Sequence, residues 1–124
     1  MNKYSILYID DEVINLMNFK LIFSDSFIIH TALTTDAAYG ILKSEPVSII
    51  FSDQRMPKVT GTDFFYAINR VDEYKKIPKV IITGHLNNDE VEIAFRDGVI
   101  KKIINEPYNE EEIAGTVKEL IADL

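Results

Sequence analysis

Three aspartates stand directly after two hydrophobic segments of the chain. Asp10 and Asp11 follow the apolar run 5–9, and Asp53 follows the run 47–52. Carboxylates held close together repel one another, and a hard cation such as Mg²⁺, which prefers oxygen ligands, relieves that repulsion. A carboxylate can also attack phosphorus and form an aspartyl phosphate, a reaction in which a metal neutralises charge. This group of acids therefore indicates metal binding coupled to phosphoryl transfer.

Each of these acids also has a plainer interpretation. An Asp–Asp pair after a strand commonly serves as an N-cap followed by a first-turn acid, which the helix dipole favours. Asp53 on its own is an ordinary loop acid. The metal interpretation holds only if the fold brings the acids together, so the elements that position them decide between the two.

Apolar runs alternate with segments of helical periodicity along the whole chain. The runs that we expect to be strands are 5–9, 27–32, 47–52, 79–83 and 99–104. The segments that we expect to be helices are 12–23, 35–42 capped by Thr34 or Thr35, 62–71, 89–96 and 110–122. Such alternation predicts an α/β protein whose parallel sheet is covered on both faces. Right-handed crossovers then favour the flavodoxin-like strand order 2-1-3-4-5 in a three-layer (βα)5 domain.

In a sheet of this order, sites form outside the carboxyl ends of the strands, where the strand order reverses between the first and third strands. Those two strands end at the three aspartates, and the fourth ends at Thr83 and Gly84. The hydroxyl of Thr83 could hydrogen-bond a phosphoryl oxygen, and Gly84 would let the backbone approach closely. This joint placement favours one metal and phosphoryl site over separate structural roles.

The composition is that of one compact globular domain, which we expect to span residues 1–124. Hydrophobic residues make up 47% of the chain, and no apolar run is long enough to cross a bilayer. Cysteine is absent, which excludes disulfides, thiol catalysis and cysteine zinc sites. The formal net charge of −7 opposes binding to nucleic acid phosphates, although an acidic excess also serves plain solubility. We expect a cytoplasmic protein that binds neither membranes nor nucleic acid directly.

The motifs of the chain resemble those of receiver domains of two-component response regulators. The motifs that carry the resemblance are Asp10-Asp11-Glu12 after a hydrophobic run, Ser52-Asp53-Gln54-Arg55-Met56-Pro57 with Gly61 beyond it, and Ile82-Thr83-Gly84. The resemblance covers essentially the whole chain and implies a flavodoxin-like fold.

The resemblance also implies a role for each site residue. Asp53 would accept a phosphoryl group from a sensor histidine kinase or a phosphotransfer protein. Asp10, Asp11 and the backbone carbonyl of Arg55 would hold Mg²⁺ together with Asp53. Thr83 would contact the phosphoryl group.

The chain departs from the family pattern at two positions after the fifth strand. The family has a lysine before the proline that follows this strand, and here Glu106 precedes Pro107. Replacing a cation by an anion changes the local charge by about two units, so a phosphorylated Asp53 would face repulsion. The alternative is that Glu106 turns to solvent and only a contact is lost. Ile103 stands where the family often has an aromatic ring, and we expect the bond between Glu106 and Pro107 to be cis.

Three further residues would modulate the site according to the resemblance. Arg55 and His85 stand two positions after Asp53 and Thr83, where receiver domains tune the lifetime of the phosphoryl group. Arg55 could supply part of the missing positive charge, because a guanidinium suits phosphate. For both side chains, exposure to solvent is the alternative. Gly84 completes this set.

Two functions from different classes follow from these observations. The first is a phosphorylation-dependent switch that catalyses at most its own phosphoryl transfer and dephosphorylation. The second is a pseudo-receiver, a protein-interaction module that signals without phosphorylation, which Glu106 and Ile103 favour. A small hydrolytic enzyme is disfavoured because no Gly-x-Gly-x-x-Gly loop appears. We expect a monomer or weak homodimer with a kinase partner and a downstream output domain or effector.

Overall fold

The computed structural model describes residues 3–84 and 88–122 of the chain. The strands are β1 (Ser5–Ile9), β2 (Ile28–Ala32), β3 (Ile49–Asp53), β4 (Lys79–Thr83) and β5 (Lys102–Asn105). The helices are α1 (Val13–Phe23), α2 (Thr35–Ser44), α3 (Gly61–Ile68), α4 (Asp72–Lys75), α5 (Asp89–Arg96) and α6 (Glu110–Ala122). None of the helices in these two ranges has the length and apolar composition that crossing a bilayer requires.

The five strands form one parallel sheet in the order β2-β1-β3-β4-β5, which confirms the predicted order. The register aligns the carboxyl ends of the central strands. Ile9 of β1 lies beside Ser52 of β3, and Asp53 lies beside Ile82 of β4. The residues that follow β1, β3 and β4 therefore meet at one edge of the sheet.

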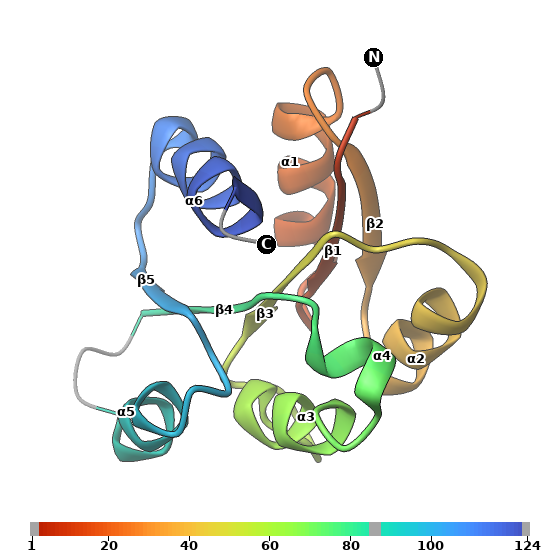
Figure 1. The fold of residues 1–124 in the computed structure, drawn as a ribbon. Coiled ribbons are helices and arrows are strands. Elements are labelled where there is room, and N and C mark those ends of the chain that lie inside the picture. The colour runs from red at the N-terminus through yellow and green to blue at the C-terminus, as the bar shows by residue number, and fades with distance from the viewer. Residues whose placement is uncertain (1–2, 85–87, 123–124) are drawn as a thin grey trace.

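Helices cover both faces of the sheet, as Figure 1 shows, with α1 and α6 on one side and α2, α3, α4 and α5 on the other. Alternate residues of each strand point to opposite faces. Tyr8 and Phe51 therefore belong to the core under α1 and α6, whereas Leu7 and Ile50 belong to the core on the opposite face. Burial on both faces explains why the strands are almost continuously apolar.

Several boundaries differ from the sequence prediction by one or two residues, and the two largest differences, of three residues each, are explained by local backbone geometry. The predicted helix 62–71 ends at Ile68, because Val71 is extended and forms the N-cap of the short helix α4, which the sequence did not predict. The predicted strand 99–104 begins only at Lys102. Gly98 adopts a positive φ of 77°, and the N–H of Val99 turns back to bond the carbonyl of Ala94, so this stretch caps α5.

The predicted cap of α2 is confirmed. The side chain of Thr34 accepts a hydrogen bond from the N–H of Ala37 at 3.1 Å. Asn109 caps α6 in the same way, accepting from the N–H of Glu112 at 2.8 Å. The bond between Glu106 and Pro107 is cis, as expected.

Candidate functional site

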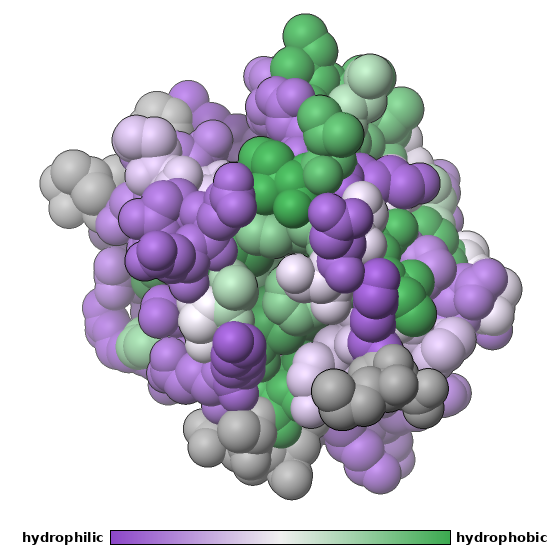
Figure 2. Space-filling model, turned by 90° about the horizontal axis from the view of Figure 1, so that it is seen from above, coloured by the Kyte–Doolittle hydropathy of each residue, from purple (hydrophilic) through white to green (hydrophobic). Residues whose placement is uncertain are grey.

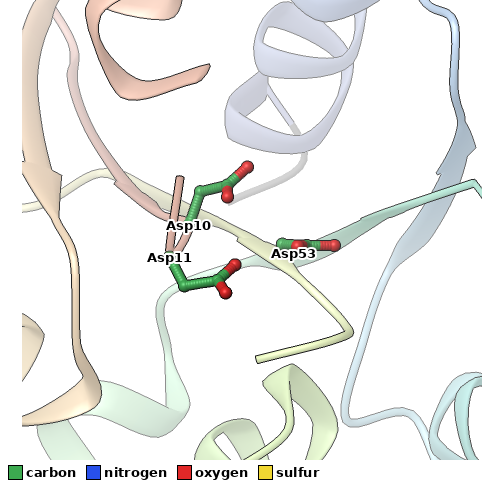
Figure 3. A group of neighbouring side chains, drawn as sticks. All are labelled: Asp10, Asp11 and Asp53. Atoms are coloured by element: carbon green, nitrogen blue, oxygen red, sulfur yellow. The ribbon is translucent and has the colours of Figure 1, made fainter. Parts of the chain in front are cut away.

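The fold brings the three aspartates of the sequence prediction together. Asp10 and Asp11 follow β1 and Asp53 ends β3, and one carboxylate oxygen from each lies within 4.8 Å of the others. Figure 3 shows Asp10 and Asp11 extending from the end of β1 toward the end of β3, where Asp53 lies. The capping interpretation of these acids is therefore insufficient, because three carboxylates converge on one place.

Asp10 is buried and held firmly by its neighbours. It is 2% exposed, and its Oδ2 accepts hydrogen bonds from Tyr8 Oη at 2.6 Å and from Asn15 Nδ2 at 3.0 Å. Its Oδ1 accepts from the backbone N–H of Glu12 at 2.9 Å. Sequence analysis missed Tyr8 and Asn15. Strand periodicity, which puts residues 8 and 10 on the same face, is a signal that could have identified Tyr8.

Asp53 resists ionisation in this environment. Burial, followed by the negative charges of Asp10, Glu106 and Asp11, raises the pKa of Asp53 to about 7, although a hydrogen bond from the backbone N–H of Arg55 acts in the opposite direction. A divalent cation would reverse this effect by favouring the charged form. The donor set of three carboxylates fits a hard, oxygen-preferring cation such as Mg²⁺.

Glu106 lies at the edge of the acidic site. An atom placed where a Gly84 Cβ would be lies 4.0 Å from Glu106 Oε1, so this carboxylate reaches over the end of β4. Burial, followed by the charges of Asp10 and Glu12, raises the pKa of Glu106. The residue as a whole is exposed, yet the charges of Asp10 and Glu12 still act on its carboxylate.

The hydroxyl residue expected at the end of β4 is in place. Thr83 is 2% exposed, and its carbonyl accepts the N–H of Glu106 at 2.9 Å. Arg55 is exposed at the start of the loop after β3. His85 lies outside the described residues.

Gly61 packs directly against the backbone of the phosphoryl-acceptor candidate. A Cβ at Gly61 would lie 2.5 Å from the carbonyl oxygen of Asp53, so no larger residue fits without a backbone shift. Gln54, which sequence analysis missed, is 1% exposed and ties the same loop to α3. Its Oε1 accepts the N–H of Thr62, and its Nε2 donates to Thr62 Oγ1, both at 2.9 Å. These contacts fix the loop that carries Arg55.

The chain matches the family model of the response regulator receiver domain over residues 6–118. It is similar to the hydrogenase transcriptional regulatory protein HoxA of Cupriavidus necator, with 25% identity over 117 residues. The HoxA protein of Bradyrhizobium diazoefficiens is 28% identical over 118 residues. Both alignments cover 94% of this chain but 24% of the relative, so the chain spans about a quarter of their length.

Solved structures share the fold. A response regulator receiver domain protein from Clostridium thermocellum aligns with a TM-score of 0.87 and 23% identity, covering 97% of this chain and 95% of that one. The chemotaxis protein CheY4 of Vibrio cholerae aligns with a TM-score of 0.86 and 21% identity, covering 95% and 98%. At these identities the structures establish the flavodoxin-like architecture and nothing finer.

Proposed function

Because the chain belongs to the response regulator receiver domain family, we propose that it is a phosphorylation-dependent signalling switch. Receiver domains are signalling modules that bind Mg²⁺ at an acidic pocket. Here Asp53 would accept a phosphoryl group from a histidine kinase or phosphotransfer protein in a Mg²⁺-dependent reaction. The observation that carries this proposal is the convergence of Asp10, Asp11 and Asp53, whose carboxylate oxygens lie within 4.8 Å.

Each residue of the site would have a distinct role in metal binding or phosphoryl transfer. Asp10, Asp11, Asp53 and the backbone carbonyl of Arg55 would hold Mg²⁺, which supplies charge neutralisation when bound. One oxygen of Asp53 forms the bond to phosphorus as the phosphorus–nitrogen bond of the donor phosphohistidine breaks, and the electron pair of that bond returns to the imidazole nitrogen. Thr83 would then hydrogen-bond a phosphoryl oxygen.

Burial and the neighbouring carboxylates make Asp53 a poor nucleophile until a cation binds. In the metal-free protein the raised pKa of Asp53, about 7, keeps part of the population protonated at neutral pH. A protonated carboxyl is a poor nucleophile, so cation binding, which favours the charged form, would also activate Asp53. This coupling gives a physical reason for Mg²⁺ dependence that uses only the charges of this site.

Glu106 would oppose the phosphorylated state. Two like charges about 4 Å apart repel by roughly 4 kcal/mol at an effective dielectric near 20, before solvent and metal offset most of it. Because Glu106 reaches over Gly84 rather than away from the site, part of that repulsion would remain. We therefore expect slow or incomplete phosphorylation. Arg55, exposed on the loop after Asp53, would supply part of the missing positive charge.

A pseudo-receiver that signals without phosphate is the second candidate function. The same position of Glu106 favours it, since an anion already occupies the edge of the site where the family carries a lysine. Ile103 favours it too, because this side chain packs into the core beneath α5 and has no ring that could rotate with Thr83.

An apolar surface on α1 suits a helical partner such as the phosphohistidine-bearing helix of a kinase. Ile14, Met17 and Leu21 are 70%, 65% and 80% exposed and lie on one face of the helix at spacings of three and four residues. Figure 2 shows hydrophobic residues gathered over α1 on this side of the molecule, while the α6 side is mainly hydrophilic. A cavity of about 560 Å³ lies next to the acids, and its lining includes Asp11 and Val13, the first residue of α1.

Binding of a phosphoryl mimic tests the proposed function. Fluorine NMR of the protein with Mg²⁺ and beryllofluoride should show a bound signal that disappears when Mg²⁺ is chelated and in the Asp53→Asn variant. The same signal in Glu106→Lys should appear at lower beryllofluoride concentration. A signal that persists in Asp53→Asn would contradict the proposal, and no signal in either the wild type or Glu106→Lys would favour the pseudo-receiver.

A further inference from the structure

A second cavity lies at the opposite end of the sheet from the acids. It measures about 370 Å³ and is bounded by the start of β4, the segment just after α4, the connection between α5 and β5, and α6. Four lysines contribute to its lining: Lys75, Lys76, Lys79 and Lys101. No acidic residue does, although the chain has 20 acids and 13 lysines and arginines. The local charge is therefore opposite to that of the whole molecule.

Lys79 is the feature that distinguishes this cavity from a surface rich in lysine. The residue is 1% exposed, and its ammonium group donates to the carbonyls of Tyr74 at 2.7 Å and Ile77 at 2.8 Å. An ammonium group has three N–H donors, and the third has no acceptor among the described residues. The ion pair recorded in the described ranges joins Lys102 to Glu119, so Lys79 has no carboxylate partner there.

The charge of Lys79 is costly in this position. Burial, followed by the positive charge of Lys101, lowers the pKa of Lys79 to about 8. A buried charge is normally paired, because desolvation without a partner is unfavourable. An anion in the cavity would compensate both the burial and the repulsion between the two lysines.

The other residues that line the cavity indicate which groups, besides an anion, a ligand would carry. Asn69 Oδ1 is a buried acceptor without a hydrogen-bond partner in the described residues, so it could accept a bond from a ligand hydroxyl. Ile77, Pro78, Val99 and Leu120 provide apolar walls that suit a ring. A volume of about 370 Å³ lies at the small end of the range of ligand pockets, which begins near 300 Å³.

We propose that this lysine-lined cavity binds a small organic phosphate that carries a hydroxyl group and an apolar ring, the chemistry of a nucleoside monophosphate. The phosphate would receive the third N–H of Lys79 and the flanking charges of Lys75, Lys76 and Lys101. The site is separate from the acidic one, since β4 runs from Lys79 to Thr83 and places the two roughly 13 Å apart. The inference therefore does not depend on phosphorylation of Asp53.

Titration with AMP, followed by the backbone amide signals in two-dimensional NMR at constant ionic strength, tests this proposal. We expect saturable shifts confined to the lining of the cavity, which comprises Asn69, residues 75–79, 98, 99 and 101, and Leu120, with a dissociation constant in the millimolar range or below. Inorganic phosphate should compete for the site, and adenosine should bind more weakly than AMP by about fivefold or more, because it lacks the charge.

Matched variants separate a site from general attraction to lysines. The double variant Lys75→Gln/Lys101→Gln changes only exposed residues of the cavity and should lower the affinity for AMP by about fivefold or more. Lys43→Gln/Lys118→Gln removes the same charge from exposed positions outside the cavity and should leave the affinity unchanged. Lys79→Met should abolish saturable binding, and if it does not fold, the first double variant decides.

Several results would overturn the proposal. Shifts that grow linearly with the AMP concentration, or that spread over all exposed lysines, would show that AMP is attracted to lysines nonspecifically and does not bind in the cavity. Equal weakening in the two double variants would do the same. Equal affinity for adenosine and AMP would exclude a phosphate site, and Lys79 would then serve only to hold α4 against β4.

Discussion

Tyr8 Oη donates a hydrogen bond of 2.6 Å to Oδ2 of Asp10 inside the core under α1. The contact places a buried phenol directly behind a candidate metal ligand. Burial is the largest cause that raises the pKa of Tyr8, followed by its bond to Asp10, so this phenol remains a donor at any physiological pH. Asp10 is thus oriented before any cation arrives.

Tyr8→Phe removes that donor while preserving the ring that packs on Phe19, whose centroid lies 4.4 Å away. We expect the affinity for Mg²⁺ to fall about tenfold, the lower end of the effect of losing a partner behind a metal ligand. Calorimetric titration with Mg²⁺ measures it. An unchanged affinity would show that Asn15 and the N–H of Glu12 hold Asp10 sufficiently by themselves.

The metal-free protein should lose stability as the pH rises from about 4 to 7. Over this range the folded state keeps a proton on Asp53, whose pKa is about 7, while the unfolded chain has released it near its ordinary value of 3.8. The unfolded state then binds fewer protons, so the free energy of unfolding decreases with pH. Saturating Mg²⁺ should flatten this dependence, since the cation favours the ionised carboxylate.

Asp53→Asn removes the titrating group and should stabilise the metal-free protein at pH 8. We expect a gain of about 1 to 2 kcal/mol, a discounted value because Asp53 is only half-buried. Denaturant unfolding with and without EDTA measures it. The exposed acid Asp25 provides a control of the same chemical change, and Asp25→Asn should have no such effect. Equal gains in both variants would mean that the overall net charge, and not the acidic site, is responsible.

Gly61→Ala tests how tightly α3 is packed against Asp53. The new Cβ would lie 2.5 Å from the Asp53 carbonyl oxygen and 2.8 Å from Ile81 Cδ1, so the backbone must shift. We expect a loss of about 1 to 3 kcal/mol in the free energy of unfolding, the usual range for overpacking. Gly40→Ala in α2, where a Cβ meets nothing within 4 Å, should instead gain about 0.5 to 1 kcal/mol. A loss of stability in both variants would show that close packing against Asp53 does not distinguish Gly61 from other helical glycines.

Met17→Glu tests the apolar surface of α1. A charge at this 65% exposed position should slow phosphoryl transfer from a histidine kinase about tenfold, which corresponds to losing one interface anchor. The rate with acetyl phosphate should not change, because the acids are untouched. Ile93→Glu on α5, 49% exposed, is the matched control and should leave both rates as they are. A kinase rate that is equally unaffected in Met17→Glu would place the docking surface elsewhere.

The sequence predicted most of the fold because local signals agreed with the tertiary arrangement. The strand at Lys79–Thr83 and the helix at Asp89–Arg96 begin and end where predicted. Convergence of Asp10 and Asp53 was also predictable, since strand ends at the point where the order reverses must meet. The short helix α4 escaped prediction because four residues leave no periodicity to detect.

Side-chain contacts between elements that are far apart in the chain could not be predicted from the sequence. The bridge from Gln54 to Thr62 depends on how the loop after β3 folds onto α3, and no spacing rule predicts it. The sequence did not predict the burial of Lys79 either. A lysine at the start of an interior strand of a parallel sheet is nevertheless unusual, because such strands are covered on both faces. The orientation of Glu106 over Gly84 required the structure as well.

Intact-mass measurement after incubation with acetyl phosphate tests the central claim most directly. With Mg²⁺, the wild type should slowly gain the mass of one phosphoryl group at partial occupancy, and Glu106→Lys should gain it faster and to higher occupancy. EDTA or Asp53→Asn should abolish the gain in both backgrounds. Modification that survives Asp53→Asn, or its absence even in Glu106→Lys with Mg²⁺, would contradict the assignment of Asp53 as the phosphoryl acceptor.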